Sequence, residues 1–347
     1  MYTEFYGLEK KPFNMTPDPA FLFLTEQHRE ALAGLSYAIL ERKGFLVLSG
    51  TAGTGKTTLL AWVLQKLPSE RVQSSVILNP TLTPAEFLEL AMLDFDISDI
   101  PESKAQRLWK LQKFLLRGRQ EGKINVLIID EAHKLTTEVL EEIRLLGNFE
   151  YGDEKLLQVL LLGQKELDDV LNRPNLWQLK QRISVRLSLE ALSESEVERY
   201  IQYRWCVAGG KKPAPFSSGA IAGIAKCSQG IPRLINSICD NALMLAFAEE
   251  APSVSAEHVE SSAMDLQLIE KPAPKLSPAS PSWSPPPPLP SPQAMPKASA
   301  VRPNVPAVMP TPVLKTIARY NPDPAAPPIL MRWAQRLLGR RNGSKPV

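Results

Sequence analysis

The fold of this chain is decided by Gly50-Thr51-Ala52-Gly53-Thr54-Gly55-Lys56-Thr57. The stretch fits G-x-x-x-x-G-K-[ST], a loop whose glycines let successive backbone N–H groups point at one set of phosphate oxygens. An apolar run at residues 44–49 predicts a strand before it, and residues 57–67 predict a helix whose positive end faces the same anion. A chance match to a Gly/Thr-rich turn explains neither neighbour. We therefore predict that these eight residues, with Thr58, bind a nucleoside triphosphate.

Two further roles follow from the chemistry of this loop. The Lys56 ammonium can reach the β- and γ-phosphates, and the Thr57 hydroxyl can bind Mg²⁺. Asp130 ends the apolar run at residues 124–129, where a carboxylate is costly unless it is hydrogen-bonded or close to a cation. We expect Asp130 to hold the Thr57–Mg²⁺ assembly through water, which makes Thr57 and Asp130 the predicted metal residues. Glu131 is placed to activate the attacking water as a general base, against the alternative of a strand end that meets solvent.

The chain around the loop predicts a parallel sheet. Apolar runs typical of buried strands occupy residues 44–49, 76–79, 124–129, 156–162 and 183–189. Amphipathic spacing predicts helices at residues 26–40, 83–93, 105–120, 136–146 and 172–181. Strands that alternate with helices form a parallel sheet covered on both faces, so we expect an α/β fold with three αβα layers. Beyond Ser193 the pattern is helical only, which predicts a small helical domain with helices at residues 194–205, 217–228, 232–249 and 256–268.

The composition changes at residue 269. From Ile269 onward the chain holds 20 of its 32 prolines and carries 11 Lys/Arg against 2 Asp/Glu, a net charge of +9, whereas the part before it carries −6. Such a segment buries too little apolar area to offset its ordering entropy, so residues 269–328 are predicted to be a disordered proline-rich linker. Residues 329–347 form a basic tail, in which Ile329–Arg341 shows helical spacing. This segment is either a helix that docks on a membrane surface or a partner, or a disordered tail, and the sequence does not decide between the two.

Four more side chains are candidates for sensing the γ-phosphate or stabilising charge in the transition state. Gln164 follows the strand at residues 156–162, at the edge where a parallel sheet meets its ligand. Arg182 and Arg186 bracket the start of the last strand, and either can serve as an arginine finger for a neighbouring subunit. Surface salt bridging competes with that role, more strongly for Arg186. Arg233 begins a helix after Gly230-Ile231-Pro232 and can reach the γ-phosphate. The predicted catalytic residues are therefore Glu131, Gln164, Arg182 and Arg233.

Cysteine and histidine point to no metal site of their own. The three cysteines, Cys206, Cys227 and Cys239, are widely spaced and form no C-x-x-C pair, which argues against a disulfide framework and a zinc site. His133 is interpreted as structural or as a relay to the sensor rather than as a metal ligand, since His28 and His258 are remote in sequence. The tetrapeptide Asp130-Glu131-Ala132-His133 also resembles a helicase box, an alternative that we discount because those helicases use two tandem cores. With neither a secretory signal nor an 18-residue apolar run, we expect a cytoplasmic protein.

Together these motifs resemble an AAA+ ATPase, and more narrowly the general secretion pathway protein A (ExeA-type) family. The stretches that carry the resemblance lie between Met1 and about Leu268: Phe5-Tyr6-Gly7-Leu8, Pro12-Phe13, Thr16-Pro17-Asp18-Pro19, His28-Arg29-Glu30-Ala31-Leu32, Asp130-Glu131-Ala132-His133, Leu162-Gly163-Gln164, Gln181-Arg182-Ile183 and Gly230-Ile231-Pro232-Arg233-Leu234-Ile235-Asn236. The resemblance implies that residues 1–42 flank the adenine, 43–191 form the ATPase core and 192–268 form the lid. It also implies ATP and Mg²⁺ as ligands, phosphate contacts at Gly53, Gly55, Lys56 and Thr57, and a homo-oligomer.

The chain also departs from this family. Relatives continue into a membrane-spanning helix and a peptidoglycan-binding domain, whereas here a proline-rich linker and a short basic segment follow. Trp177 stands where relatives often have a basic residue. The departures put an envelope-spanning role in doubt and leave the ATPase motifs intact.

Three functions are compatible with these observations. The first is an ATPase that remodels or assembles a cell-envelope complex, held peripherally at the inner face of the cell membrane by Ile329–Arg341. The second is a DNA-binding transposition helper, which calls for a basic stripe on the ATPase or the lid; the −6 balance before residue 269 argues against it, although a local patch can hide in that sum. The third, a nucleotide-gated scaffold with little turnover, does not account for Glu131 and Arg182.

Overall fold

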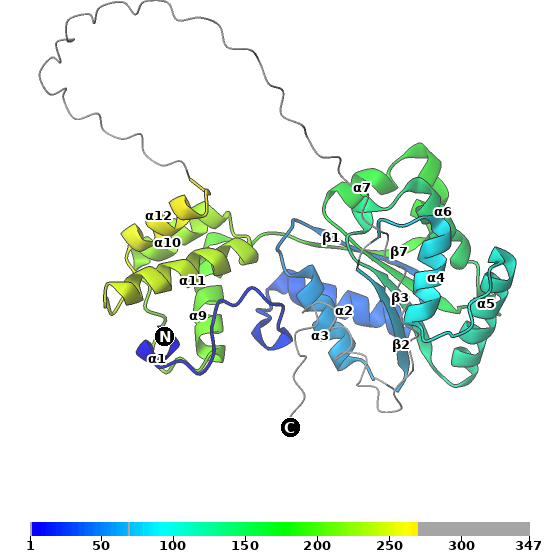
Figure 1. The fold of residues 1–347 in the computed structure, drawn as a ribbon, viewed down its shortest axis with the longest axis horizontal. Helices are drawn as coiled ribbons and strands as arrows, with labels where there is room; N and C mark the ends of the chain where they lie inside the picture. Colours follow the sequence, from blue (N-terminus) through cyan, green and yellow to red (C-terminus); the bar gives the residue numbers. More distant parts are fainter. Residues whose placement is uncertain (1, 69, 79, 270–347) are drawn as a thin grey trace, which may run out of the picture. The chain divides into compact units, whose positions relative to one another are not determined.

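The computed structural model describes residues 2–68, 70–78 and 80–269 (Figure 1). The predicted tail at residues 329–347, and the predicted linker apart from Ile269, lie outside the described residues. Among the described helices, none has both the length and the apolar composition that are needed to cross a bilayer.

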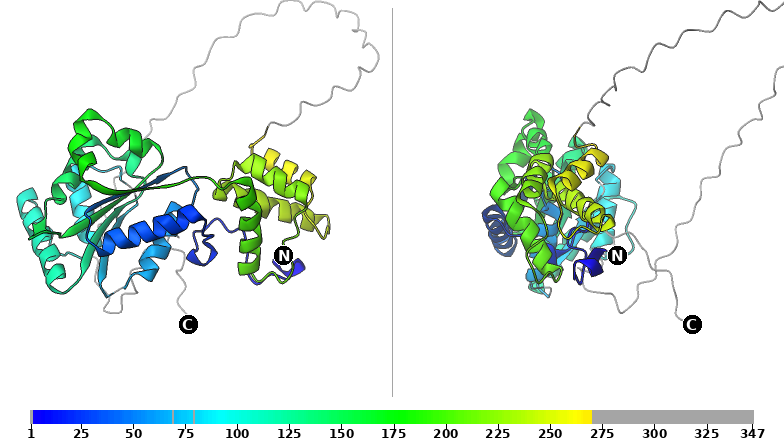
Figure 2. Two further views of the ribbon diagram at one scale, coloured as in Figure 1. Left: turned by 180° about the vertical axis from the view of Figure 1, so that it is seen from behind. Right: turned by 90° about the vertical axis from the view of Figure 1, so that its left-hand side faces the viewer.

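The centre of the fold is a five-stranded parallel sheet in the order β2-β3-β6-β1-β7. Its strands are β1 (Phe45–Gly50), β2 (Val72–Ile77), β3 (Ile124–Ile129), β6 (Leu157–Leu162) and β7 (Ile183–Leu189). Helices cover both faces: α2 (Glu26–Leu40) and α3 (Lys56–Lys66) pack on one, and α4 (Pro84–Asp94), α5 (Lys104–Gln120) and α6 (Thr137–Leu146) on the other (Figures 1 and 2). The predicted three-layer αβα fold is confirmed.

Alternate residues of the central strands feed two separate cores. In β1, Phe45 and Val47 belong to the cluster beneath α4–α6, whereas Leu46 and Leu48 belong to the cluster beneath α2 and α3. Side chains of a strand point to opposite faces in turn, so a strand covered on both faces is largely apolar. This is why β1, β3 and β6 appear in the sequence as largely apolar runs, with Ser49, Asn125 and Gln158 as their polar side chains.

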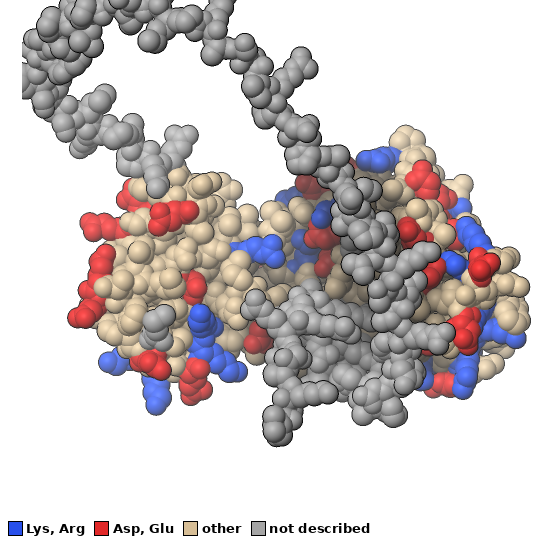
Figure 3. Space-filling view, in the orientation of Figure 1, with Lys and Arg blue, Asp and Glu red and all other residues tan. Residues whose placement is uncertain are grey.

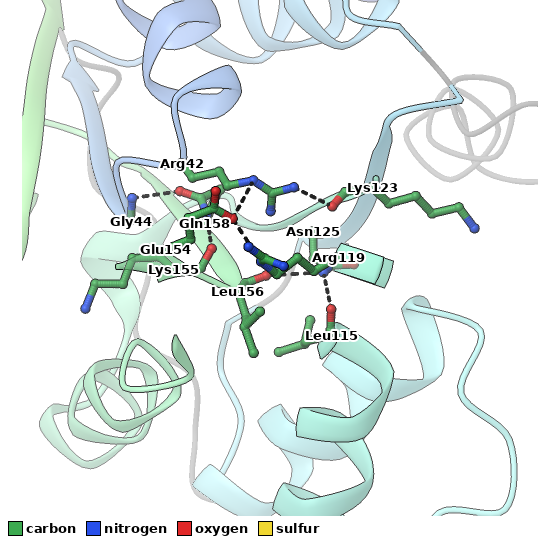
Figure 4. Close-up of polar contacts among 10 residues, drawn as sticks. All are labelled: Arg42, Gly44, Leu115, Arg119, Lys123, Asn125, Glu154, Lys155, Leu156 and Gln158. Atoms are coloured by element: carbon green, nitrogen blue, oxygen red, sulfur yellow. Dashed lines mark hydrogen bonds and ion pairs between the residues drawn. The ribbon is translucent and has the colours of Figure 1, made fainter. Parts of the chain in front are cut away.

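Polar side chains close the amino edge of the sheet (Figure 4). Gln158 of β6 accepts from the Gly44 N–H at 2.7 Å and donates to the Lys155 carbonyl at 3.1 Å. Asn125 of β3 donates to the carbonyl oxygens of Leu115 and Leu156, each at 3.2 Å. Both side chains are fully buried, and these bonds offset the desolvation of the groups that make them, whereas Asn125 Oδ1 has no hydrogen-bond partner among the described residues. The edge remote from the phosphate-binding loop is thus fixed by buried amides.

Four helices after β7 form the predicted helical bundle. They are α9 (Glu194–Val207), α10 (Ser218–Ser228), α11 (Pro232–Ala248) and α12 (Ala256–Asp265). Ser193 caps α9 in a reciprocal box with Glu196, and Ser217 caps α10. Pro232 occupies the first turn of α11, where its missing N–H costs nothing. Sequence-local signals therefore account for where these helices begin.

The N-terminal segment contributes to two cores. Its start, α1 (Tyr2–Phe5), and the buried residues Leu8 and Phe13 pack into the cluster formed by α9–α12. After the 3₁₀ helix η1 (Pro19–Phe21), α2 packs on the sheet instead. Residues 2–21, which we call the N-terminal strap, therefore complete the helical domain that forms almost 200 residues later.

Three regions around the sheet differ from the sequence-based prediction. Strand β2 begins at Val72 rather than residue 76, because the sheet-edge stretch Gln73-Ser74-Ser75 is polar and hides the pattern. The single helix expected at 172–181 is replaced by α7 (Glu166–Leu171), the 3₁₀ helix η3 (Pro174–Leu176) and α8 (Trp177–Arg182), since Pro174 interrupts the run. A small hairpin, β4 (Glu150–Tyr151) with β5 (Glu154–Lys155), was not expected.

Candidate nucleotide site

A cavity of about 490 Å³ opens where the sheet, the lid helices and the N-terminal strap meet. Small-molecule sites span about 300–1,000 Å³. Its lining includes residues 52–58 of the phosphate-binding loop, Asp130, Glu131, Gln164 and Arg233. These four segments, which are far apart in the sequence, converge on one space. Gly50 and Thr51 lie at the base of the loop and do not line the cavity.

The loop has a backbone that only glycine adopts without strain. Gly53 has a φ of +84°, and a Cβ there would lie 2.8 Å from the Cβ of Arg233. Gly50 has a φ of +152°, and a Cβ there would lie 2.3 Å from the carbonyl oxygen of Leu189. These contacts pack the loop between the last strand and the lid. The loop is therefore a preformed cradle that side chains at these positions would fill.

The helix after the loop presents unpaired donors to the cavity. Its N-cap is Gly55, which offers no side-chain cap, and the first backbone bond to close is Leu59 N–H to Gly55 O at 2.8 Å. The N–H groups of Lys56, Thr57 and Thr58, all cavity-lining residues, precede that bond and have no acceptor within the helix. An anion suits this position, because both the N–H groups and the helix dipole favour negative charge.

Lys56 is a buried cation at the same point. Its Nζ donates to the carbonyl oxygens of Gly50 at 2.8 Å and Thr51 at 2.9 Å. Burial lowers the pKa of Lys56, and the nearby carboxylates of Asp130 and Glu131 oppose that shift. The ammonium therefore lies within a donor-rich, partly desolvated pocket, which strengthens its attraction to a polyanion.

Asp130 and Thr57 supply two hard oxygen groups side by side. The Thr57 hydroxyl donates to Asp130 Oδ2 at 3.1 Å, and the Glu131 N–H donates to Asp130 Oδ1 at 2.9 Å. Burial raises the pKa of Asp130, while these two hydrogen bonds lower it. A hydroxyl and a carboxylate are the ligand types that Mg²⁺ prefers, so this donor set fits the predicted ion.

A histidine joins the predicted base to the predicted sensor. The Gln164 backbone N–H donates to His133 Nδ1 at 3.3 Å, which leaves the ring proton on Nε2. That nitrogen lies 3.5 Å from Glu131 Oε2, and Lys134 Nζ lies 3.3 Å from the same oxygen. Glu131 itself has a left-handed backbone, with φ +55°. His133 thus contacts both residues, and its interpretation as structural or as a relay stays a prediction; nothing in the sequence indicated Lys134.

The three arginines divide between two places. Arg233 lines the cavity, and its backbone N–H donates to the Gly53 carbonyl at 3.2 Å. Arg182 and Arg186 do not line it: Arg182 Nη1 donates to the Arg144 carbonyl at 2.9 Å, and Arg186 pairs with Asp168 at 2.9 Å. Ile183, next to Arg182, is in register with Phe45 at the start of β1, whereas the nucleotide loop follows the end of β1. Arg182 therefore lies at the opposite edge of the sheet.

Several lining residues were not predicted as site residues. His28 of α2 is buried, with its Nδ1 2.7 Å from the Thr25 hydroxyl. Tyr200 and Arg204 of α9 and Asn236 of α11 form a polar wall, and the strap adds residues 14–18. Short stretches containing His28 and Asn236 carried the family resemblance, but spacing alone marks them as parts of helices. Tyr200 and Arg204 had no signal.

Comparison with known proteins agrees with this geometry. A model of the AAA domain matches residues 39–171, which hold the loop, Asp130, Glu131 and Gln164. The chain carries an AAA domain. General secretion pathway protein A of Aeromonas hydrophila is 43% identical over 249 residues, which are 72% of this chain and 45% of that protein. The resemblance to an AAA+ ATPase of this family is confirmed, and the chain spans less than half the length of this relative.

Solved structures support the AAA fold. The ORC1 protein of Aeropyrum pernix in complex with DNA has a TM-score of 0.56 and 18% identity, over 74% of this chain and 69% of that chain. Cdc6p of Pyrobaculum aerophilum has a TM-score of 0.55 and 15% identity, over 73% and 72% respectively. At such low identity these similarities concern the fold alone.

Proposed function

We propose that this AAA domain protein binds and hydrolyses ATP to ADP and phosphate. The observation that carries the proposal is the meeting of Lys56, the Asp130–Glu131 pair and Arg233 around one cavity. The backbone N–H groups of the loop and Lys56 would hold the phosphates. Mg²⁺, held by Thr57 and Asp130, would neutralise phosphate charge.

Glu131 is the proposed general base. It would take a proton from the attacking water, and it is suited to this because a third of its side chain is exposed at the cavity while His133 and Lys134 orient its carboxylate. Gln164, linked to the same histidine, would orient the water or detect the γ-phosphate. Arg233 would contact the γ-phosphate from the lid. Release of the γ-phosphate on hydrolysis would therefore remove a contact of α11.

The active form is proposed to be a homo-oligomer in which Arg182 serves a neighbouring nucleotide. Arg182 lies at the sheet edge away from its own cavity, so it can act only on another subunit's site. Arg186 is the weaker candidate, because its guanidinium already pairs with Asp168.

The proposed process is remodelling or assembly of a cell-envelope complex. Its support is the 43% identity to general secretion pathway protein A, together with the shared AAA domain. A cytoplasmic location, with peripheral contact to the inner face of the membrane through Ile329–Arg341, stays a prediction of the sequence.

Helix α5 favours the alternative of a DNA-binding transposition helper. It carries six basic and no acidic residues: Lys104, Arg107, Lys110, Lys113, Arg117 and Arg119. Four of the six, however, pair with carboxylates, namely those of Glu142, Glu89, Glu121 and Glu154. Blue and red side chains accordingly alternate at the right of Figure 3, where α5 lies. Such a surface offers a duplex little net positive charge, so we rank this function second.

ATP turnover of the full chain, with and without duplex DNA at moderate salt, tests both functions. Glu131→Gln is the inactive control variant: its turnover should fall about 100-fold or more while ATP still binds. Glu138→Gln, an exposed change on α6, is the matched control. Turnover that ignores DNA supports the envelope motor. Strong stimulation by DNA would replace it with the transposition helper, and absence of turnover would leave only a nucleotide-gated scaffold.

A further inference from the structure

Arg204 on α9 is a buried cation in the wall of the cavity. It is 7% exposed, and none of the carboxylates in the described residues lies within ion-pair distance of it. An arginine keeps its charge at any pH that a folded protein tolerates, and a buried charge without a counter-ion is costly. The contacts of Arg204 must therefore offset the cost of burying its charge.

Three of these contacts fix the N-terminal strap. Arg204 Nε donates to the Pro12 carbonyl at 2.6 Å, and Nη2 donates to the Asn14 carbonyl at 3.4 Å. The guanidinium also lies 4.8 Å from the centre of the Phe21 ring, close enough for a cation–π contact. Arg204 therefore holds the strap on both sides of residues 15–18, which line the cavity.

A fourth contact starts a directional chain of hydrogen bonds. Arg204 Nη1 donates to the Tyr200 hydroxyl at 3.1 Å, and that hydroxyl donates to Asn236 Oδ1 at 2.9 Å. Burial raises the pKa of Tyr200, so the phenol keeps its proton at neutral pH. Because the guanidinium can only donate, the hydroxyl proton must go to an acceptor, which sets the orientation of the Asn236 amide. Its Nδ2 makes no hydrogen bond within the described part of the chain, and Asn236 lines the cavity.

These groups are distinct from those that face the phosphates. They come from α9, the strap and α11, where Asn236 lies about one turn after Arg233, and none belongs to the phosphate-binding loop or follows β3 or β6. We propose that Arg204 is a positioning residue for the nucleoside half of the ligand: it holds the strap in place and, through Tyr200, turns the Asn236 amide N–H groups toward an acceptor nitrogen of the base. This proposal rests on the proposed ATP binding.

The test compares two ligands that share phosphates but differ in the nucleoside. Affinities of the full chain for ATP and for inorganic tripolyphosphate, both with Mg²⁺, are measured by calorimetry. Arg204→Met is expected to weaken ATP binding about 10- to 100-fold, the usual effect of losing hydrogen bonds to a buried charge, and to leave tripolyphosphate affinity within about twofold. Tyr200→Phe, which keeps the ring and breaks only the link to Asn236, is expected to weaken ATP binding several-fold with the same selectivity.

Arg199→Met is the matched control on the same helix, since the exposed Arg199 donates to Ser195 of its own helix at 3.3 Å and does not line the cavity. It should change neither affinity. If Arg204→Met does not fold, Tyr200→Phe decides the question alone. Equal losses for both ligands, or no loss for either, would overturn the positioning role. A wild-type chain that binds tripolyphosphate and ATP keeps the proposed ATP binding whatever the variants do, and turnover is tested separately; one that binds neither ends both proposals.

Discussion

The backbone N–H of Arg233, at the start of a lid helix, donates to the carbonyl oxygen of Gly53 in the phosphate-binding loop at 3.2 Å. This bond ties the lid to the loop through main-chain atoms, and the Arg233 side chain extends from the same residue into the cavity. Movement of the loop and movement of α11 are therefore coupled at one residue, and substitutions on either side of the bond should affect both.

Gly53→Ala should disrupt this junction. The new methyl group would lie 2.8 Å from the Arg233 Cβ at a φ of +84°, so the loop and α11 must separate. We expect ATP affinity to fall at least tenfold, as measured by calorimetry. Gly152→Ala is the matched control, because it has a similar φ of +60° with open space around it. If Gly152→Ala lowered ATP affinity equally, the loss in Gly53→Ala would be attributed to backbone strain at a positive φ and not to the clash with Arg233.

Asp130→Asn should stabilise the protein while it abolishes turnover. Burial raises the pKa of Asp130, so the folded protein binds that proton more tightly than the unfolded chain. The ionised carboxylate therefore costs stability at neutral pH, and this cost is relieved as the pH falls through the folded pKa. The amide removes the charge, and Tm without nucleotide should rise by about 2–4 °C for each kcal/mol gained. A lower Tm would mean that the carboxylate is net stabilising.

Mixing two inactive variants should restore turnover. Arg182→Ala keeps an intact cavity but supplies no finger, and Lys56→Met keeps the finger but binds no ATP. In a mixed oligomer an Arg182→Ala cavity can face a Lys56→Met neighbour, so we expect activity well above the sum of the separate variants. The measurement is phosphate release against mixing ratio, with Arg186→Ala as the variant that stays active alone. An additive mixture would argue that Arg182 does not act between subunits.

Phe13→Ala should loosen the lid domain. The Phe13 ring is fully buried in the cluster of α9–α12, where it packs edge-on against Phe216 at 6.0 Å. Truncation of such a ring costs about 3–5 kcal/mol, which thermal unfolding would report as a lower Tm. Phe5→Ala, in the same strap but 45% exposed, should have a much smaller effect. Equal effects would indicate that the strap does not pack as described.

The parts of the site that the sequence predicted are those encoded locally. The loop at 50–57 and the Asp130–Glu131 pair each stand directly after an apolar strand, so a few adjacent residues suffice to locate them. Arg204 and Tyr200 gave no such signal, because their partners, Pro12, Asn14 and Asn236, are remote in sequence. The polar edge strand β2 was placed too late for a related reason: its burial comes from tertiary packing that its own residues do not display.

The N-terminal strap also has a consequence for how the chain reaches its native state. Tyr2 is hydrogen-bonded to Asp240, so residues 238 positions apart must meet. During synthesis the strap leaves the ribosome well before α9–α12, which hold its partners. Contacts of such sequence separation form late, since loop closure precedes any gain from packing. The sheet can assemble earlier. The wall of the cavity that belongs to the lid is complete only after the strap has packed against α9–α12.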